Sequence, residues 1–331
     1  MPWSEWPQWL WPCCIAFAVS VLGTRWAIRY AHRQDLLDHP GERRSHHSPT
    51  PRGGGIGIVL ATLGCCVWLS RMDAFIWGWA ATGLALIAIT GWWDDHRNLP
   101  VWPRLAMHVL AGGLLAIALY AHSGSWQISA LAIVLVPVLV NVWNFMDGID
   151  GLAASQAALC GLALAGATSG SAQGFALVVA ATCLGFLPFN LPQANIFLGD
   201  VGSGALGYLM ALLVLACLPA YPVTLWPLLL MPLGAMLVDA GMTLGCRMWR
   251  GERWWQPHVQ HLYQRFARRA GHGWVTAAYA GWTALAIGIM LVALRLGGAE
   301  GLSAGGVFAV TSLGLWVVLY RKAGGSEGIS S

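Results

Sequence analysis

Residues 201–238 read VGSGALGYLMALLVLACLPAYPVTLWPLLLMPLGAMLV and contain no Asp, Glu, Lys or Arg. A helix that crosses the hydrocarbon core of a bilayer needs about 20 mainly apolar residues. The stretch is therefore long enough for two such helices, with residues 218–222 as the turn between them. An uncharged run of this length favours a membrane protein over a soluble domain.

The same pattern continues through most of the chain. Residues 105–146 and 151–199 also lack charged side chains. Only 10% of the 331 residues are charged, whereas about 25% are charged in a typical soluble domain. We predict an all-α polytopic membrane protein that forms one domain over residues 1–331. Its expected eleven spans are 9–31, 54–70, 74–92, 103–121, 128–145, 152–169, 173–190, 203–219, 223–246, 275–295 and 303–320.

The distribution of Arg and Lys predicts the orientation, since basic loops stay in the cytoplasm. If the N-terminus lies outside, only Arg71 and Arg295 of the 18 basic residues fall on the outer side. We expect a bacterial inner-membrane protein with a periplasmic N-terminus. Residues 247–273 and the tail 322–331 would be cytoplasmic. The N-terminus lacks the basic stretch of a secretory signal, and the eight cysteines form no Cys-x-x-Cys pair that would indicate zinc.

Two polar segments lie on the predicted cytoplasmic side in the first third of the chain. Residues 38–55 form a basic loop that contains Arg52 and ends in Gly53-Gly54-Gly55. Backbone amides at a glycine-rich helix start suit an anion, but taken alone the segment favours a flexible, basic, positive-inside loop. Asp94 and Asp95 are adjacent carboxylates, which repel each other unless a cation or proton intervenes. Divalent metal, proton transfer or an ordinary solvated turn would each account for them.

A third segment places amides and carboxylates at the end of an apolar span. Asn141, Asn144, Asp147 and Asp150 recur every three residues, which brings them roughly onto one face of a helix. Such groups at a span end are costly unless they are satisfied, so functional use is favoured. In a fourth segment, Asp200 lies among glycines before an apolar helix, where its oxygens suit magnesium.

The late loop and the span before it also contain candidate residues. If residues 258–265 are helical, His258, His261 and Arg265 share a face that suits phosphate. A zinc pair and an amphipathic helix on an anionic membrane surface are the alternatives. Asp239, inside the ninth span, is either a functional carboxylate or a structural polar contact.

The order of these motifs resembles the polyprenyl-phosphate N-acetylhexosamine-1-phosphate transferase family, from about residue 35 to 269. The matching segments, in order, are PTPRGGG (49–55), DD (94–95), NFMDGIDGL (144–152), FLGDVGS (197–203) and the segment 258–261. The resemblance implies ten or eleven helices around a cytoplasmic cleft. It also implies Mg²⁺, with Mn²⁺ as an alternative.

The resemblance further implies substrates and residue roles. The donor would be a UDP-HexNAc and the acceptor undecaprenyl phosphate in the lipid bilayer, with no nucleic-acid partner. UMP would be released at the start of O-antigen or other cell-envelope polysaccharide synthesis. The implied metal ligands are Asp200 and Asn144, the catalytic acids are Asp94, Asp95, Asp147 and Asp150, and the substrate or phosphate ligands are Arg52, Arg104, Asn141, His258, His261 and Arg265.

Some features stay open at the level of sequence. Val259 and Gln260 stand where several relatives have further histidines, and the ending Tyr263-Gln264-Arg265 is more like relatives that use 6-deoxy-HexNAc donors. The donor is then GlcNAc or a 6-deoxy-HexNAc such as FucNAc or QuiNAc. Asp94 and Asp95 would act as base, as positioning groups or through a phospho-aspartate. A homodimer and a multi-pass transporter are further options.

Overall fold

The computed structural model describes residues 6–38, 49–253 and 259–324. The fold is helical, apart from an antiparallel pair of two-residue strands in which Leu37 lies opposite Pro51. The α-helices are α1 (Trp6–Arg33), α2 (Ile56–Leu69), α3 (Ala74–Arg97), α4 (Val101–Ser123), α5 (Trp126–Met146), α6 (Leu152–Ala167), α7 (Gly170–Phe186), α8 (Gly199–Cys217), α9 (Gly234–Trp249), α10 (Leu262–Ala270), α11 (His272–Leu296) and α12 (Gly298–Gly324). The remaining elements are β1 (Leu37–Asp38), β2 (Thr50–Pro51) and the 3₁₀ helices η2 (Leu187–Phe189), η3 (Leu218–Ala220) and η4 (Val223–Leu233).

The prediction of a polytopic helical membrane protein is confirmed. Among the described residues, nine helical segments are long and apolar enough to cross a membrane. The other two predicted spans are the shorter apolar helices α2 and α6, with 14 and 16 residues. At a rise of 1.5 Å per residue, these two extend over about 21 Å and about 24 Å, less than the roughly 30 Å of a bilayer core.

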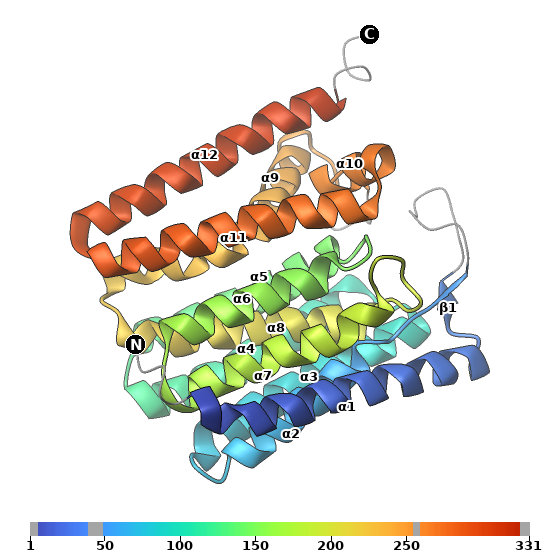
Figure 1. Cartoon of the computed structure of the whole chain (residues 1–331), viewed down its shortest axis with the longest axis horizontal. Coiled ribbons are helices and arrows are strands. Elements are labelled where there is room, and N and C mark those ends of the chain that lie inside the picture. The colour runs from blue at the N-terminus through green and yellow to red at the C-terminus, as the bar shows by residue number, and fades with distance from the viewer. Residues whose placement is uncertain (1–5, 39–48, 254–258, 325–331) are drawn as a thin grey trace.

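The helices form two groups. Helices α1 to α8 make one bundle with α8 near its centre, where α8 packs against α3, α5 and α6. Segments η4 and α9, with α11 and α12, form a second group that lies above this bundle in Figure 1. Helix α1 begins at the left of the view and α12 ends at the right, so the first and last spans point the same way.

Two helix boundaries differ from the prediction and determine where the acids lie. Helix α3 continues to Arg97 and ends at Asn98, whose φ is 47°. Asp94 and Asp95 therefore belong to its last turns and not to a loop. Helix α5 ends at Met146, so Asp147 and Asp150 lie in the turn beyond it. Hydrophobicity marks the part of a helix in the bilayer, whereas the helix itself ends where its backbone hydrogen bonds end.

The glycine segment is tied to the start of α8. The N–H groups of Gly54 and Gly55 donate to the carbonyls of Phe197 (2.9 Å) and Leu198 (3.0 Å). A Cβ added to Gly55 would clash with the Cα of Gly202, so glycine allows this close approach. The interpretation of these two amides as anion donors is wrong, because both are already bonded to carbonyl groups.

Candidate active site

The carboxylate of Asp95 caps the helix that carries Asp200. Its two oxygens accept hydrogen bonds from the backbone N–H groups of Asp200 (2.9 Å) and Val201 (3.1 Å). The first N–H groups of a helix have no partner within the helix and attract negative charge. Asp95 is buried, and a Cβ on Gly199 would come within 2.6 Å of it. One acid from α3 thus fixes the helix start that presents a second acid.

Arg104 connects Asp94 with Asp200. Its Nη1 donates to Asp94 Oδ2 and lies 3.8 Å from Asp200 Oδ2. The other oxygen of Asp94 accepts the N–H of Leu99 at 2.5 Å. The Nε of Arg104 is buried, and it has no hydrogen-bond partner within the described part of the chain. This arrangement orders three predicted site residues and leaves one buried guanidinium donor for a ligand.

Arg52 lies near Asp95. Its Nη2 is 3.4 Å from Asp38 Oδ1, and both Arg52 and Asp95 line a cavity of about 20 Å³. This small cavity is bordered by Tyr30 and His96, which contact each other at 3.3 Å. We call Asp94, Asp95, Asp147 and Asp200 the acidic cluster. Its two nearby cations are Arg52 and Arg104.

The turn after α5 brings Asp147 to the same cluster. Asp147 is half-buried and follows the last helical residue. Burial, followed by the negative charges of Asp200 and Asp95, raises its pKa well above the usual range, and Arg52 opposes this shift. Asp147 therefore lies within electrostatic range of Asp95, Asp200 and Arg52. Asn144 lies on the last turn of α5, where its carbonyl accepts the N–H of Asp147 at 3.4 Å.

Asp150 points to a partner that sequence reasoning did not identify. Its Oδ2 lies 3.2 Å from Nδ1 of His272, the first residue of α11. The hydroxyl of Thr276 donates to the backbone carbonyl of Asp150 at 2.8 Å. More than 100 residues separate these partners in the chain, so no local pattern indicates the contact. This contact joins residues 147–151, which we call the acidic turn, to the second group of helices.

The regular spacing of Asn141, Asn144, Asp147 and Asp150 does not produce one helical face. Gly151 has a φ of 72°, and the turn before it directs Asp150 towards α11. The amide of Asn141 donates to the carbonyl of Pro137 in its own helix (2.7 Å). The expectation of a single face is wrong because α5 stops at Met146 and the acids occupy a turn.

The late motif is divided between two surroundings. His258 lies outside the described residues. His261 precedes α10, is buried, and its Nδ1 lies 4.0 Å from Asp239 Oδ1. Arg265 points to α12, where its Nη2 donates to the Tyr320 hydroxyl (2.9 Å) and its guanidinium stacks 4.1 Å from the Tyr320 ring centre. His261 and Arg265 therefore do not share one phosphate-facing surface.

The acidic cluster fits a magnesium ion that shares its coordination with a substrate. No three Asp, Glu, His or Cys side chains in the described ranges come close enough to hold a metal by themselves. Magnesium commonly uses one or two carboxylates together with water and substrate phosphates. Asp200 and Asp147 are partly exposed carboxylates of the cluster, and the negative charges of Asp200 and Asp95 add to the effect of burial in raising the pKa of Asp147. Both observations suit a divalent cation bound with a phosphate ligand.

Comparisons with known proteins agree with the resemblance drawn from the motifs. The profile of "Glycosyl transferase family 4" matches residues 77–218, which include Asp94, Asp147 and Asp200. A Mycolicibacterium smegmatis decaprenyl-phosphate N-acetylglucosaminephosphotransferase is 28% identical over 59% of this chain and 56% of its own. The chain thus spans about half the length of the first curated relatives it matches.

Two other relatives are matched over more of their length. A probable undecaprenyl-phosphate N-acetylglucosaminyl 1-phosphate transferase of Bacillus subtilis is 28% identical over 76% of each chain. A phospho-N-acetylmuramoyl-pentapeptide-transferase of Frankia alni is 32% identical over 58% of this chain and 71% of its own. From the order of its motifs, the profile match and these relatives, the chain belongs to glycosyl transferase family 4.

Proposed function

We propose that the chain transfers HexNAc-1-phosphate from a UDP-HexNAc to undecaprenyl phosphate and releases UMP. The observation that supports this proposal best is the junction of Asp94, Asp95, Arg104 and Asp200 at the start of α8. It combines ordered carboxylates for a cation with a guanidinium donor for phosphate. The relatives' names support the same reaction class.

The reaction joins two anions, so its barrier is largely electrostatic. An oxygen of the lipid phosphate attacks the phosphorus that carries the sugar. The bond from that phosphorus to the oxygen of UMP breaks, and UMP leaves with the electron pair. Magnesium, when bound, neutralises charge on the pyrophosphate and on the leaving group. We assign its coordination to Asp200 with help from Asn144.

The chain's own residues would hold the two substrates. Arg104 offers its buried Nε to a phosphate oxygen while Asp94 fixes its guanidinium. Arg52, which lines a small cavity together with Asp95, is the second candidate phosphate ligand. Asp147, Asp150 and His261 complete the proposed site from the acidic turn and the start of α10. Arg265 is left out because Tyr320 engages its guanidinium.

The contacts of Asp94 and Asp95 favour a positioning role over a role as general base. Both oxygens of Asp95 accept backbone N–H groups, and those of Asp94 accept from Leu99 and Arg104. A phosphate monoester is also mostly dianionic at neutral pH, because its second pKa is about 6. Its attack on the donor then needs little help from a base.

The Arg and Lys distribution favours a cytoplasmic position for this site in a bacterial inner membrane. UDP-sugars would reach it from the cytoplasm. The Tyr263-Gln264-Arg265 sequence favours a 6-deoxy-HexNAc donor such as FucNAc or QuiNAc, whereas the names of the relatives favour GlcNAc. The product would begin an O-antigen or another cell-envelope polysaccharide.

The test is UMP release by the purified chain, supplied with undecaprenyl phosphate, Mg²⁺ and a panel of UDP-HexNAc donors. The proposal expects UMP from at least one donor, and none when the acceptor lipid is left out. Absence of UMP with every donor would reject the transferase assignment.

A further inference from the structure

We propose that Asp239 is a positioning residue of this site: it fixes the start of α10 so that His261 and Tyr263 face the acidic turn. The effect on catalysis rests on the proposed transferase function. The effect on structure does not, since it concerns only how α10 is held. Asp239 lies on α9 within a membrane-spanning segment and is 1% exposed. A buried carboxylate in such a segment requires strong partners.

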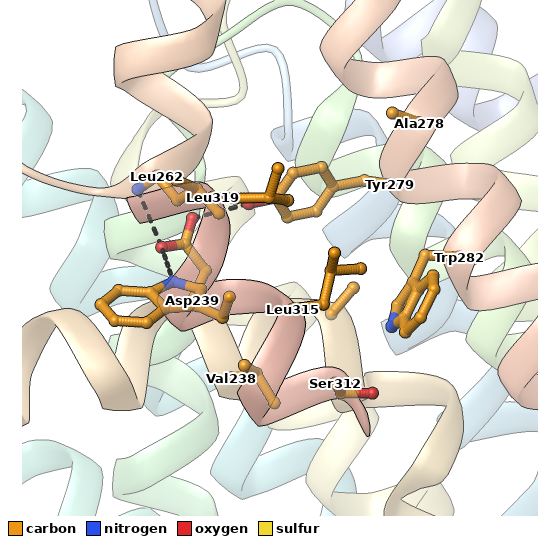
Figure 2. A pocket seen from close by; sticks show the side chains of 11 residues that line it. Val238, Asp239, Leu262, Ala278, Tyr279, Trp282, Ser312, Leu315 and Leu319 are labelled. Carbon is orange, nitrogen blue, oxygen red and sulfur yellow. Dashed lines mark hydrogen bonds between the residues drawn. The ribbon is translucent and has the colours of Figure 1, made fainter. Parts of the chain in front are cut away.

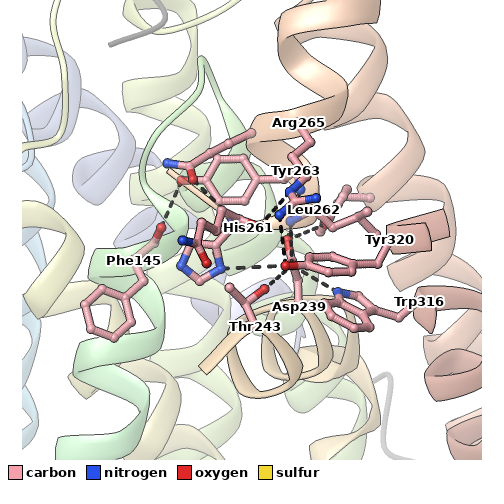
Figure 3. A network of polar contacts seen from close by, with 12 residues as sticks. Phe145, Asp239, Thr243, His261, Leu262, Tyr263, Arg265, Trp316 and Tyr320 are labelled. Carbon is pink, nitrogen blue, oxygen red and sulfur yellow. Dashed lines mark hydrogen bonds and ion pairs between the residues drawn. The ribbon is translucent and has the colours of Figure 1, made fainter. Parts of the chain in front are cut away.

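Asp239 receives hydrogen bonds from four helices. Its oxygens accept the backbone N–H groups of Leu262 (2.9 Å) and Tyr263 (3.0 Å), the first two residues of α10. Further donors are Thr243 of α9 (3.2 Å), Tyr279 of α11 (2.7 Å) and Trp316 of α12 (3.1 Å). Figure 3 shows Leu262, Thr243 and Trp316 around the carboxylate.

The bonds to Leu262 and Tyr263 determine the position of α10. A carboxylate at a helix start satisfies N–H groups that the helix leaves unpaired. Because this carboxylate comes from another helix, it also fixes where α10 begins in space. Asp95 acts on α8 in the same way. Asp95 of α3 thus holds the start of α8, and Asp239 of α9 holds the start of α10. Both helix starts border the candidate site.

Tyr263 carries this position to the acidic turn. Its hydroxyl donates to the carbonyl of Phe145 on the last turn of α5 at 2.9 Å. A Cβ on Gly148 would collide with that hydroxyl, so the ring lies directly against the turn that holds Asp147. His261, the residue before α10, stacks with Tyr263 and with Phe145. A shift of α10 would therefore move the backbone beside Asp147 and the imidazole of His261.

Apolar packing beside Asp239 is incomplete. A cavity of about 220 Å³ lies between α9, α11 and α12, with Val238, Tyr279, Leu315 and Trp316 among its walls. Figure 2 shows Asp239 at the border of this cavity, bonded to Leu262 and Tyr279. Close packing normally gives helices one fixed position. Where it is interrupted, the hydrogen bonds of Asp239 become the stronger constraint on α10.

The experiment compares Asp239→Asn with Thr243→Val in the full-length purified protein. Asn keeps the size of the side chain but replaces one acceptor oxygen by an NH₂ group, which opposes a backbone donor. Val keeps the shape of Thr243 and removes one of the five donors to Asp239. Amide hydrogen exchange in residues 259–270 and 145–151 reports position, and kcat and KM for the donor report function.

For Asp239→Asn we expect exchange of the Leu262 and Tyr263 amides to accelerate about tenfold, while amides of α1 to α4 keep their rates. We expect kcat to fall about 10- to 100-fold with a small change in KM, as for other residues that support a site indirectly. Thr243→Val should stay within about twofold of the unmodified protein in both readouts. Combining Asp239→Asn with Tyr263→Phe should cost less than the product of the single effects, because both act through one contact chain.

Unchanged exchange in α10 and the acidic turn of Asp239→Asn would overturn the proposal. So would an equal loss in Thr243→Val, because a general disturbance of α9 would then explain both. If Asp239→Asn does not fold, Trp316→Phe is measured in its place. This substitution removes one donor to Asp239 and keeps an aromatic ring. It should accelerate exchange of the same amides by a smaller factor, and unchanged exchange would overturn the proposal. If the unmodified protein releases no UMP, the proposed function fails, while the exchange measurements still decide the role of Asp239.

Discussion

The carboxylate of Asp95 accepts a hydrogen bond from the backbone N–H of Asp200 at 2.9 Å, across 105 residues of sequence. It accepts a second from Val201 at 3.1 Å. The first four N–H groups of a helix lack internal partners, so Asp95 completes the start of α8 from another helix. The position of the proposed metal-binding carboxylate thus depends on an acid that itself need not touch the metal.

Replacing Asp95 should separate stability from activity. For Asp95→Asn we expect a loss of about 1–2 kcal/mol in unfolding free energy and a fall of kcat of about 100-fold or more, because Asp200 moves. Asp73→Ala is the control, since Asp73 caps α3 at the far end of the bundle by accepting the N–H groups of Phe75 and Ile76 through Oδ1, and Ala removes this cap. It should lower stability and keep kcat. Equal kcat losses in both variants would contradict the account.

Arg104 and Asp94 should act as one unit. Arg104→Gln removes the charge between Asp94 and Asp200, so we expect KM for the UDP-sugar to rise and kcat to fall. Asp94→Asn should lose much of the same activity, because it frees the guanidinium. A double-mutant cycle should give a coupling free energy of at least about 1 kcal/mol. Fully additive effects would mean that the two residues act independently.

The sequence predicts the membrane fold well, because the requirement for about 20 apolar residues per span acts locally. The helix starts and ends that build the site are harder to predict. Asp94 and Asp95 look like loop residues because they are charged, although α3 continues through them to Arg97. The spacing of Asp147 and Asp150 suggests a helix, whereas the Gly148 and Gly151 positions form a turn.

Partners distant in the chain are not visible in one sequence. His272 pairs with Asp150, and Asp239 binds the start of α10, over separations that no short motif records. The motifs therefore identify the carboxylates of the site but not the residues that hold them. The role of His258 stays a prediction, because this residue lies outside the described residues.

Asp147 should give the ligand-free protein a characteristic pH dependence. Burial and the charges of Asp200 and Asp95 raise its pKa, whereas an unfolded Asp titrates near about 3.9. As pH rises above about 4, the unfolded state releases this proton first, so unfolding becomes more favourable and stability falls. Thermal unfolding in EDTA from about pH 4.5 to about pH 8.5 should show this fall, and Asp147→Asn should flatten it. A steeper fall in Asp147→Asn would contradict the assignment.

Arg265 should behave as a packing residue. Its contacts to Tyr320 and to the carbonyl of Gln260 predict that Arg265→Gln lowers the Tm and leaves KM for the donor within about twofold. Arg52→Gln is the comparison, since Arg52 borders the acidic cluster and its loss should raise KM. A large rise of KM in Arg265→Gln would place its guanidinium on a substrate phosphate after all.

We propose that the acidic cluster at the start of α8 supports sugar-phosphate transfer to a lipid. The most direct measurement is UMP release from a UDP-HexNAc panel by the unmodified protein and by Asp200→Asn, with undecaprenyl phosphate, in Mg²⁺ and in EDTA. We expect UMP from the unmodified protein with Mg²⁺, none in EDTA, and a loss of at least about 100-fold in Asp200→Asn. UMP release that is equal in both proteins, or absent with every donor, would contradict the proposal.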